Sequence, residues 1–94
     1  MVVVRYLWRP RFAELLATVA PGGLLFYDTF AAGHERLGRP RNPDFLLQPG
    51  ELPQRLHGAF AVLAFEQGPV DEGAPAIVQR VVARRQPVVT NSSP

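Results

Sequence analysis

The chain has 94 residues and a mass of 10.4 kDa, which allows one small domain and excludes a two-domain enzyme. With 47% hydrophobic residues, 19% charged residues and a net charge of +2, the composition is that of a globular protein and excludes a disordered chain. All ten basic residues are arginine, but their excess over the eight acidic residues is too small to predict nucleic acid as a partner. The absence of cysteine excludes disulfides, thiol nucleophiles and thiolate metal sites.

Two apolar segments of the chain lack the features of a signal peptide or a membrane span. Residues 1–4 run directly into Arg5, with neither a basic leader nor a cleavage site, so they do not have the pattern of a signal peptide. The longest uninterrupted apolar stretch, residues 59–65, is far too short to cross a bilayer. We therefore expect a soluble cytoplasmic protein that does not bind membranes.

Residues 1–30 have the pattern of a strand, a helix and a second strand. Residues 1–7 are β-branched and aromatic around one arginine, which predicts a strand buried on both faces. Pro10 suits the first position of a helix, and Pro-Gly-Gly at 21–23 ends that helix. Its apolar face is predicted to comprise Phe12, Leu15, Leu16 and Val19. Residues 24–30 (LLFYDTF) predict the second strand, parallel to the first and reached through the crossover helix.

Glycine and proline interrupt residues 31–53, which predicts a long ordered loop or lid. Loops of this length inside small domains are often functional. A short helix that begins at Pro49 or only at Pro53 is expected to end at Gly58.

The last part of the chain predicts an antiparallel hairpin. Residues 60–66 and 76–85 are expected to form its two strands, joined by the turn-rich residues 67–75. Residues 1–85 would then make a single α/β domain, and residues 86–94 a flexible tail.

Several kinds of catalytic site are excluded by residue type and spacing. No serine or threonine lies in a G-x-S-x-G elbow, so hydrolase chemistry is not expected. His34 and His57 lie in different segments without metal-ligand spacing, so no metal site is predicted. Gly22 and Gly23 lack the other glycines of a dinucleotide loop, so no cofactor-binding residue is predicted in this chain.

Polar and aromatic side chains follow both strands of the predicted parallel pair. Ligands of open parallel sheets bind beyond the carboxyl ends of the strands, so we predict a substrate site there, without assigning a catalytic residue. The candidate substrate-binding residues are Tyr6, Trp8, Arg9, Thr29, His34 and Arg36. An equal alternative is that Trp8 packs under the loop and that Arg36, Arg39 and Arg41 form a solvated turn. Contact of these arginines and Phe45 with nucleic acid is a weaker prediction.

Several strings of residues resemble the C-terminal half of class I S-adenosylmethionine-dependent methyltransferases, near the tellurite-resistance-type branch. They are YLWRP at 6–10, PGGLLFYDTF at 21–30, GRPRNPDFLL at 38–47, PGEL at 49–52 and QR at 79–80. Many class I methyltransferases share the pattern of a helix, Pro-Gly-Gly and a strand. The segment 38–52 is a more specific sign of the resemblance. The resemblance implies a partial Rossmann-like methyltransferase sheet whose last strand is antiparallel and lies between the second and third strands of this chain.

Members of this family bind the cofactor through a glycine-rich loop and an acidic residue, and these 94 residues contain no counterpart of either. The resemblance implies that the cofactor is S-adenosylmethionine and that this chain alone does not bind it. The chain would then be the substrate-side portion of a methyltransferase, acting on an unknown small acceptor once a complementary N-terminal half is supplied. The alternative is a noncatalytic, truncated domain that associates with itself or with a partner.

The strand expected at residues 1–7 would be an interior strand of the family's sheet, but it has no outer partner in this chain. Three valines, with no lysine and no proline before Pro10, give it the character of an edge that recruits another chain. We therefore predict a two-fold dimer with the first strands side by side. The alternative is that the tail or the long loop folds over this edge.

Overall fold

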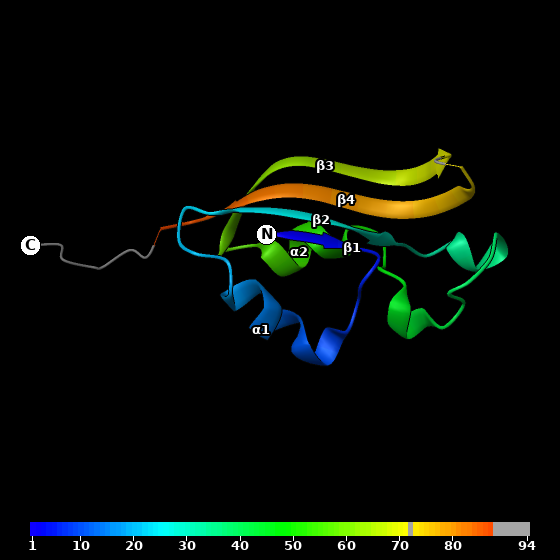
Figure 1. The fold of residues 1–94 in the computed structure, drawn as a ribbon, viewed down its shortest axis with the longest axis horizontal. Coiled ribbons are helices and arrows are strands. Elements are labelled where there is room, and N and C mark those ends of the chain that lie inside the picture. The colour runs from blue at the N-terminus through cyan, green and yellow to red at the C-terminus, as the bar shows by residue number, and fades with distance from the viewer. Residues whose placement is uncertain (72, 88–94) are drawn as a thin grey trace, which may run out of the picture.

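The computed structural model describes residues 1–71 and 73–87, which form an α/β structure built on one four-stranded mixed sheet (Figure 1). The elements are β1 (Val2–Val4), the 3-10 turn η1 (Arg9–Arg11), α1 (Phe12–Ala17), β2 (Leu24–Phe30), the 3-10 turns η2 (His34–Arg36) and η3 (Pro43–Phe45), α2 (Glu51–Leu56), β3 (Phe60–Asp71) and β4 (Pro75–Arg85). None of the helices in the described residues is long and apolar enough to span a membrane.

The strands lie in the order β1-β2-β4-β3. β1 is parallel to β2, whereas β4 is antiparallel to both β2 and β3. The predicted parallel pair joined through a helix is confirmed, and so is the predicted pairing of residues 76–85 with residues 24–30. The bounds predicted for the second strand are also confirmed.

The first strand is shorter than predicted. The expectation of a strand over residues 1–7, buried on both faces, is wrong: β1 ends at Val4, and only Val3 of its three residues is buried. The reason lies at Arg5, whose φ of +57° is in the left-handed region and ends the extended backbone. Its backbone N–H still donates to Asp28 O at 2.7 Å, so the chain leaves the sheet directly beyond this bond.

The second hairpin strand is longer than predicted. Residues 67–71, expected within a turn, belong to β3, and Pro69 is paired with Ile77 of β4. β3 is an edge strand of the sheet, where a proline costs no ladder hydrogen bond if its nitrogen faces outward. Glycine and proline therefore indicated a turn where the strand continues.

The helices are short and pack with the apolar residues predicted for them. The first begins as η1, which contains Pro10, and continues as α1. Phe12 and Val19 are buried, and Leu15 and Leu16 pack against the core. α2 begins at Glu51, between the two predicted starts, so Pro53 lies in the first turn, where a backbone N–H has no partner within the helix.

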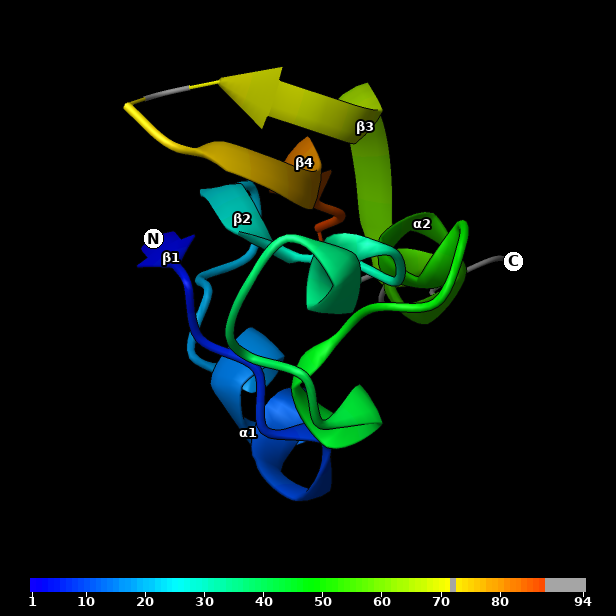
Figure 2. The same ribbon diagram turned by 90° about the vertical axis from the view of Figure 1, so that its right-hand side faces the viewer.

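Both helices cover the same face of the sheet, which is the lower face in Figures 1 and 2. Residues that point to this face alternate along the strands and include Tyr27 and Val81, which are paired between β2 and β4. Leu52 and Leu56 of α2 join the same hydrophobic cluster and are fully buried. The core is therefore a single layer between the sheet and the two helices.

The opposite face of the sheet has no helix over it within residues 1–71 and 73–87 (Figure 2). Apolar side chains of β1 and β2 are exposed there, among them Val2, which is paired with Phe26, and Val4. An ion pair lies beside Val4, because Val4 is paired with Asp28 of β2 and Asp28 is paired with Arg80 of β4. Arg80 Nε is 2.9 Å from Asp28 Oδ2.

Arginine side chains close the loops at the end of the sheet that carries the start of β2. The Arg85 guanidinium donates to the carbonyl oxygens of Ala17, the last residue of α1, and of Val19, which follows the helix. Arg84 donates to Gly22 O at 2.8 Å. Of the tail predicted at 86–94, Gln86 donates its backbone N–H to Ala59 O, and residues 88–94 lie outside the described part.

Candidate functional site

A cleft of about 380 Å³ lies beyond the carboxyl ends of the parallel strands β1 and β2. We call it the aromatic cleft; its lining residues are Arg5, Tyr6, Leu7, Trp8, Thr29, Phe30, Pro40 and Phe45. Because carboxyl ends of parallel strands meet at one edge of a sheet, the segments that follow them are brought together here. The long loop supplies the remaining wall through Pro40 and Phe45.

The backbone after β1 is held against β2 by a buried phenol. The Tyr27 hydroxyl donates to the carbonyl oxygen of Tyr6. Burial, followed by the neighbouring Tyr6, raises the pKa of Tyr27 to about 12, so this hydroxyl keeps its proton as a donor. The bond fixes the path on which Tyr6, Leu7 and Trp8 leave the sheet.

The walls of the aromatic cleft carry partly exposed rings. Trp8 and Phe45 are stacked with their centroids 6.4 Å apart and an interplanar angle of 26°. Tyr6 is 50% exposed, and the Arg5 guanidinium lies 4.5 Å from the centroid of Phe30. Such rings offer flat apolar faces to a small ligand.

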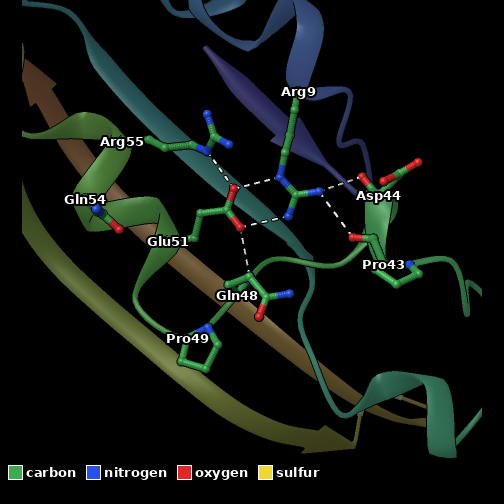
Figure 3. Close-up of a pocket in the computed structure, with 8 residues that line it drawn as sticks. All are labelled: Arg9, Pro43, Asp44, Gln48, Pro49, Glu51, Gln54 and Arg55. Carbon is green, nitrogen blue, oxygen red and sulfur yellow. Dashed lines mark hydrogen bonds and ion pairs between the residues drawn. The ribbon is translucent and has the colours of Figure 1, made fainter.

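A second, larger hollow of about 580 Å³ lies beside α2 and holds the Arg9 network, formed by Arg9, Glu51 and Arg55 (Figure 3). Arg9 donates from Nε and Nη2 to the two carboxylate oxygens of Glu51, each at 2.8 Å. Its remaining N–H groups are taken by backbone oxygens, at 3.2 Å to Pro43, 2.9 Å to Asp44 and 2.6 Å to Leu46. All five N–H donors of a guanidinium are thereby used inside the chain.

Glu51 is the centre of this network. Burial alone would raise its pKa, but hydrogen bonds from Arg9, from the Gln48 backbone and from Arg55 outweigh burial and lower the pKa to about 2. Arg55 Nε lies 2.6 Å from Glu51 Oε2. Because the charges of Arg9 and Glu51 already satisfy one another, this pair leaves little hydrogen-bonding capacity for a ligand.

His34 lies behind the aromatic cleft. Its ring is buried and stacks on Phe30 with the centroids 4.1 Å apart. Nδ1 accepts the backbone N–H of Ile77 at 3.3 Å, and Nε2 lies 3.0 Å from the carbonyl oxygen of Arg39. Both ring nitrogens are therefore engaged by backbone groups within the chain.

The predicted substrate-binding residues therefore separate into groups. Tyr6, Trp8 and Thr29 line the aromatic cleft together. Arg9 lies in the neighbouring network, and His34 supports Phe30 from behind. The sixth candidate, Arg36, is exposed in η2 and lines neither of the two hollows described above.

Several lining residues were not predicted from the sequence. Phe30 is the last residue of β2, so the same sheet-edge argument that selected Thr29 could have selected it. The sequence predicts for Phe45 only a contact with nucleic acid, and no pattern in it places this ring opposite Trp8. Glu51 had no signal beyond an acidic residue in the first turn of a helix.

Within residues 1–71 and 73–87, no group of three or more histidine and acidic side chains is placed to hold a metal ion. The aromatic cleft instead has the features of a site for a small organic molecule: a concave, mostly apolar wall with few polar groups. Comparisons with protein-family models and with curated proteins found no match to this chain.

Proposed function

We propose that the chain is the substrate-side portion of an S-adenosylmethionine-dependent methyltransferase and that the aromatic cleft holds the methyl acceptor. The observation that carries this proposal is the place of the cleft, at the carboxyl ends of a parallel strand pair, in a sheet of order β1-β2-β4-β3. This order is the one that the resemblance in residues 6–52 implies for a partial Rossmann-like sheet. The protein would act in the cytoplasm.

The proposed roles follow the geometry of the side chains. Methyl transfer requires the acceptor atom to be aligned with the methyl-sulfur bond, so positioning is the main contribution of this half. Tyr6 and Trp8, which are partly exposed in the cleft, would contact the acceptor, whereas Thr29 is only 2% exposed and would not. Arg9 and His34 would act as positioning residues, because Arg9 binds the backbone that leads to Phe45 and His34 stacks on Phe30.

The chain alone is expected to bind S-adenosylmethionine weakly or not at all, because these 94 residues contain no glycine-rich loop of the kind that binds it. Calorimetric titration of the chain should give no binding at micromolar concentration. The coding region upstream of Met1 should encode a strand followed by such a loop, and a product that includes it should bind the cofactor. Micromolar binding by the 94 residues would contradict the proposal, and an upstream region without the loop would restrict it to a half that another chain supplies.

The longer product should transfer labelled methyl groups to a small-molecule acceptor. Tyr6→Leu is expected to lower this transfer at least tenfold without changing cofactor affinity, because Tyr6 lies in the acceptor cleft only. Glu14→Gln, in an exposed pair on α1, is the matched control and should leave transfer unchanged.

A second function, noncatalytic self-association, is favoured by the edge of the sheet at β1. β1 is a terminal strand of the sheet, and its residues Val2 and Val4 are 71% and 53% exposed. A short apolar strand with its outer backbone groups unpaired is a site for pairing with another chain. Two copies with their β1 strands antiparallel would form a two-fold dimer.

Sedimentation at micromolar concentration tests this second function. The chain should be a dimer, and Val4→Lys should make it a monomer, because the substitution places like charges near the two-fold axis. Leu63→Lys, on the opposite edge strand β3 and similarly exposed, should leave the dimer intact. A wild-type monomer, or equal effects of the two substitutions, would show that the β1 edge is not the interface.

A further inference from the structure

We propose that the aromatic cleft selects a flat, electrically neutral aromatic or heteroaromatic ring. The identification of this ring as the methyl acceptor rests on the function proposed above, whereas its binding does not. The inference follows from the nature of the walls, from the charge at the cleft and from the rigidity of the rings.

Four of the lining side chains are aromatic, and they come from three separate segments. Tyr6 and Trp8 follow β1, Phe30 ends β2, and Phe45 belongs to η3. Trp8 and Phe45 are 43% and 39% exposed, so much of their surface is available to a ligand. A planar ring placed among them gains offset stacking contacts that a saturated ring of the same size cannot make.

The charge beside the cleft argues against a cationic ligand. Aromatic walls can bind quaternary ammonium groups, but the Arg5 guanidinium already lies over the face of Phe30. A ligand cation would be repelled by this neighbour, and none of the lining residues is acidic.

An anionic ligand is disfavoured by Asp28. Its Oδ1 atom is buried, accepts no hydrogen bond within the described residues and lies 3.9 Å from Arg5 Nη1. Arg5 is therefore already paired with a carboxylate, and an anion brought to it would have to compete with Asp28 for the guanidinium. A neutral ring meets neither cost, and the hydroxyl group of the half-exposed Tyr6 remains to contact one polar substituent on it.

The rings are held before any ligand arrives. Arg9 binds the backbone oxygens of Pro43, Asp44 and Leu46, which flank Phe45. On the other wall, His34 stacks on Phe30 at 4.1 Å and is itself bonded through both ring nitrogens. Because these side chains are already ordered, little binding free energy is lost in ordering them when a ligand binds.

Trp8 is the only tryptophan, so its indole N–H gives one reporter signal in an NMR titration of the chain. The probes are 2-naphthol, its saturated counterpart decahydro-2-naphthol, and choline. We expect 2-naphthol to shift the Trp8 signal in a saturable way and to bind at least about tenfold more tightly than either other probe. Equal or tighter binding of decahydro-2-naphthol or of choline would overturn the proposal.

Two substitutions locate the site. Phe45→Leu removes one ring of the stack and should weaken 2-naphthol binding about tenfold. Phe65→Leu changes a ring of β3 that is similarly exposed, at 37% against 39%, and should leave binding unchanged. Tyr6→Leu gives a second test on the opposite side of the cleft if Phe45→Leu does not fold. Loss of binding in Phe65→Leu, or its retention in both cleft variants, would place the ligand elsewhere and overturn the proposal.

This experiment separates the two proposals because it needs neither cofactor nor methyl transfer. If 2-naphthol binds as expected but the longer product methylates no aromatic compound, the binding site stands and the methyltransferase function fails. If methyl transfer occurs only to saturated or charged acceptors, the function stands and the inference about the ring fails.

Discussion

Glu51→Gln is expected to lower the free energy of unfolding by about 3 kcal/mol at pH 7, as measured by urea denaturation. The carboxylate is buried and accepts hydrogen bonds from Arg9, from Arg55 and from the Gln48 backbone. A neutral amide has one acceptor oxygen, which can accept at most two of these four hydrogen bonds, and it leaves partly buried arginine charges without their partner.

The matched control is Glu14→Gln. Glu14 forms an ion pair with Arg11 at 3.3 Å, but both side chains are 71% exposed, so the change should cost less than about 0.5 kcal/mol. Equal effects of the two substitutions would contradict a special role of Glu51.

The effect of Glu51→Gln should also depend on pH. The pKa of Glu51 is lowered from 4.5 to about 2 in the folded chain, so its stabilisation is complete above pH 4.5 and is lost as the pH falls toward 2. The stability difference between the wild type and the variant should therefore shrink over this range.

Gln79→Leu is expected to lower the free energy of unfolding by about 2 kcal/mol, although it places an apolar residue at a fully buried position of the core. Gln79 Nε2 donates to the carbonyl oxygen of Gln48, and its Oε1 accepts the backbone N–H of Leu52 at 3.1 Å. Leucine would leave the Leu52 N–H without a partner at the buried start of α2, and such a group costs about 1 to 3 kcal/mol. The Gln48 oxygen would lose one of its two bonds, since it also accepts the Glu51 backbone N–H at 3.0 Å.

Gln67→Leu provides the comparison, because Gln67 also binds the start of α2. Its Oε1 accepts the backbone N–H of Gly50 at 2.9 Å, but this bond is exposed and water can replace it. Chemical denaturation should show a loss below about 1 kcal/mol for this variant. A larger loss in Gln67→Leu than in Gln79→Leu would mean that burial does not set the cost of these bonds.

Local pattern predicts single elements of this fold, whereas the place of β4 between β2 and β3 was implied only by the resemblance. The apolar and aromatic run of β2 has turn residues on one side, and its bounds were predicted correctly. The predicted first strand is longer than β1, because the residue type of Arg5 does not indicate its left-handed φ. β3 was cut short because Gly68 and Pro69 indicate turns in most contexts and are tolerated here on an edge strand.

The candidate site was predictable only to the extent that the sheet places it. Tyr6, Trp8 and Thr29 share the aromatic cleft because the two parallel strands end at one edge. The position of Phe45 depends on how the long loop folds, and that loop is held by a bond between residues 42 apart in sequence, from Arg9 to Glu51. No local pattern reports a contact over such a separation.

The guanidinium groups that bind backbone oxygens have a consequence for the behaviour of the chain in alkali. Arg9 and Arg85 close the loop before α2 and the end of α1, and a guanidinium keeps its charge where a lysine would lose it. The hydrogen bonds of these guanidinium groups therefore persist above pH 10. Ionisation of the buried Tyr27 phenol then limits the stability of the fold in alkali. Its pKa is raised to about 12, so the stabilisation from the protonated hydroxyl is complete below pH 10 and is lost as the pH rises toward 12. The same ionisation would release the carbonyl of Tyr6, so in alkali the aromatic cleft should loosen first on the side that follows β1.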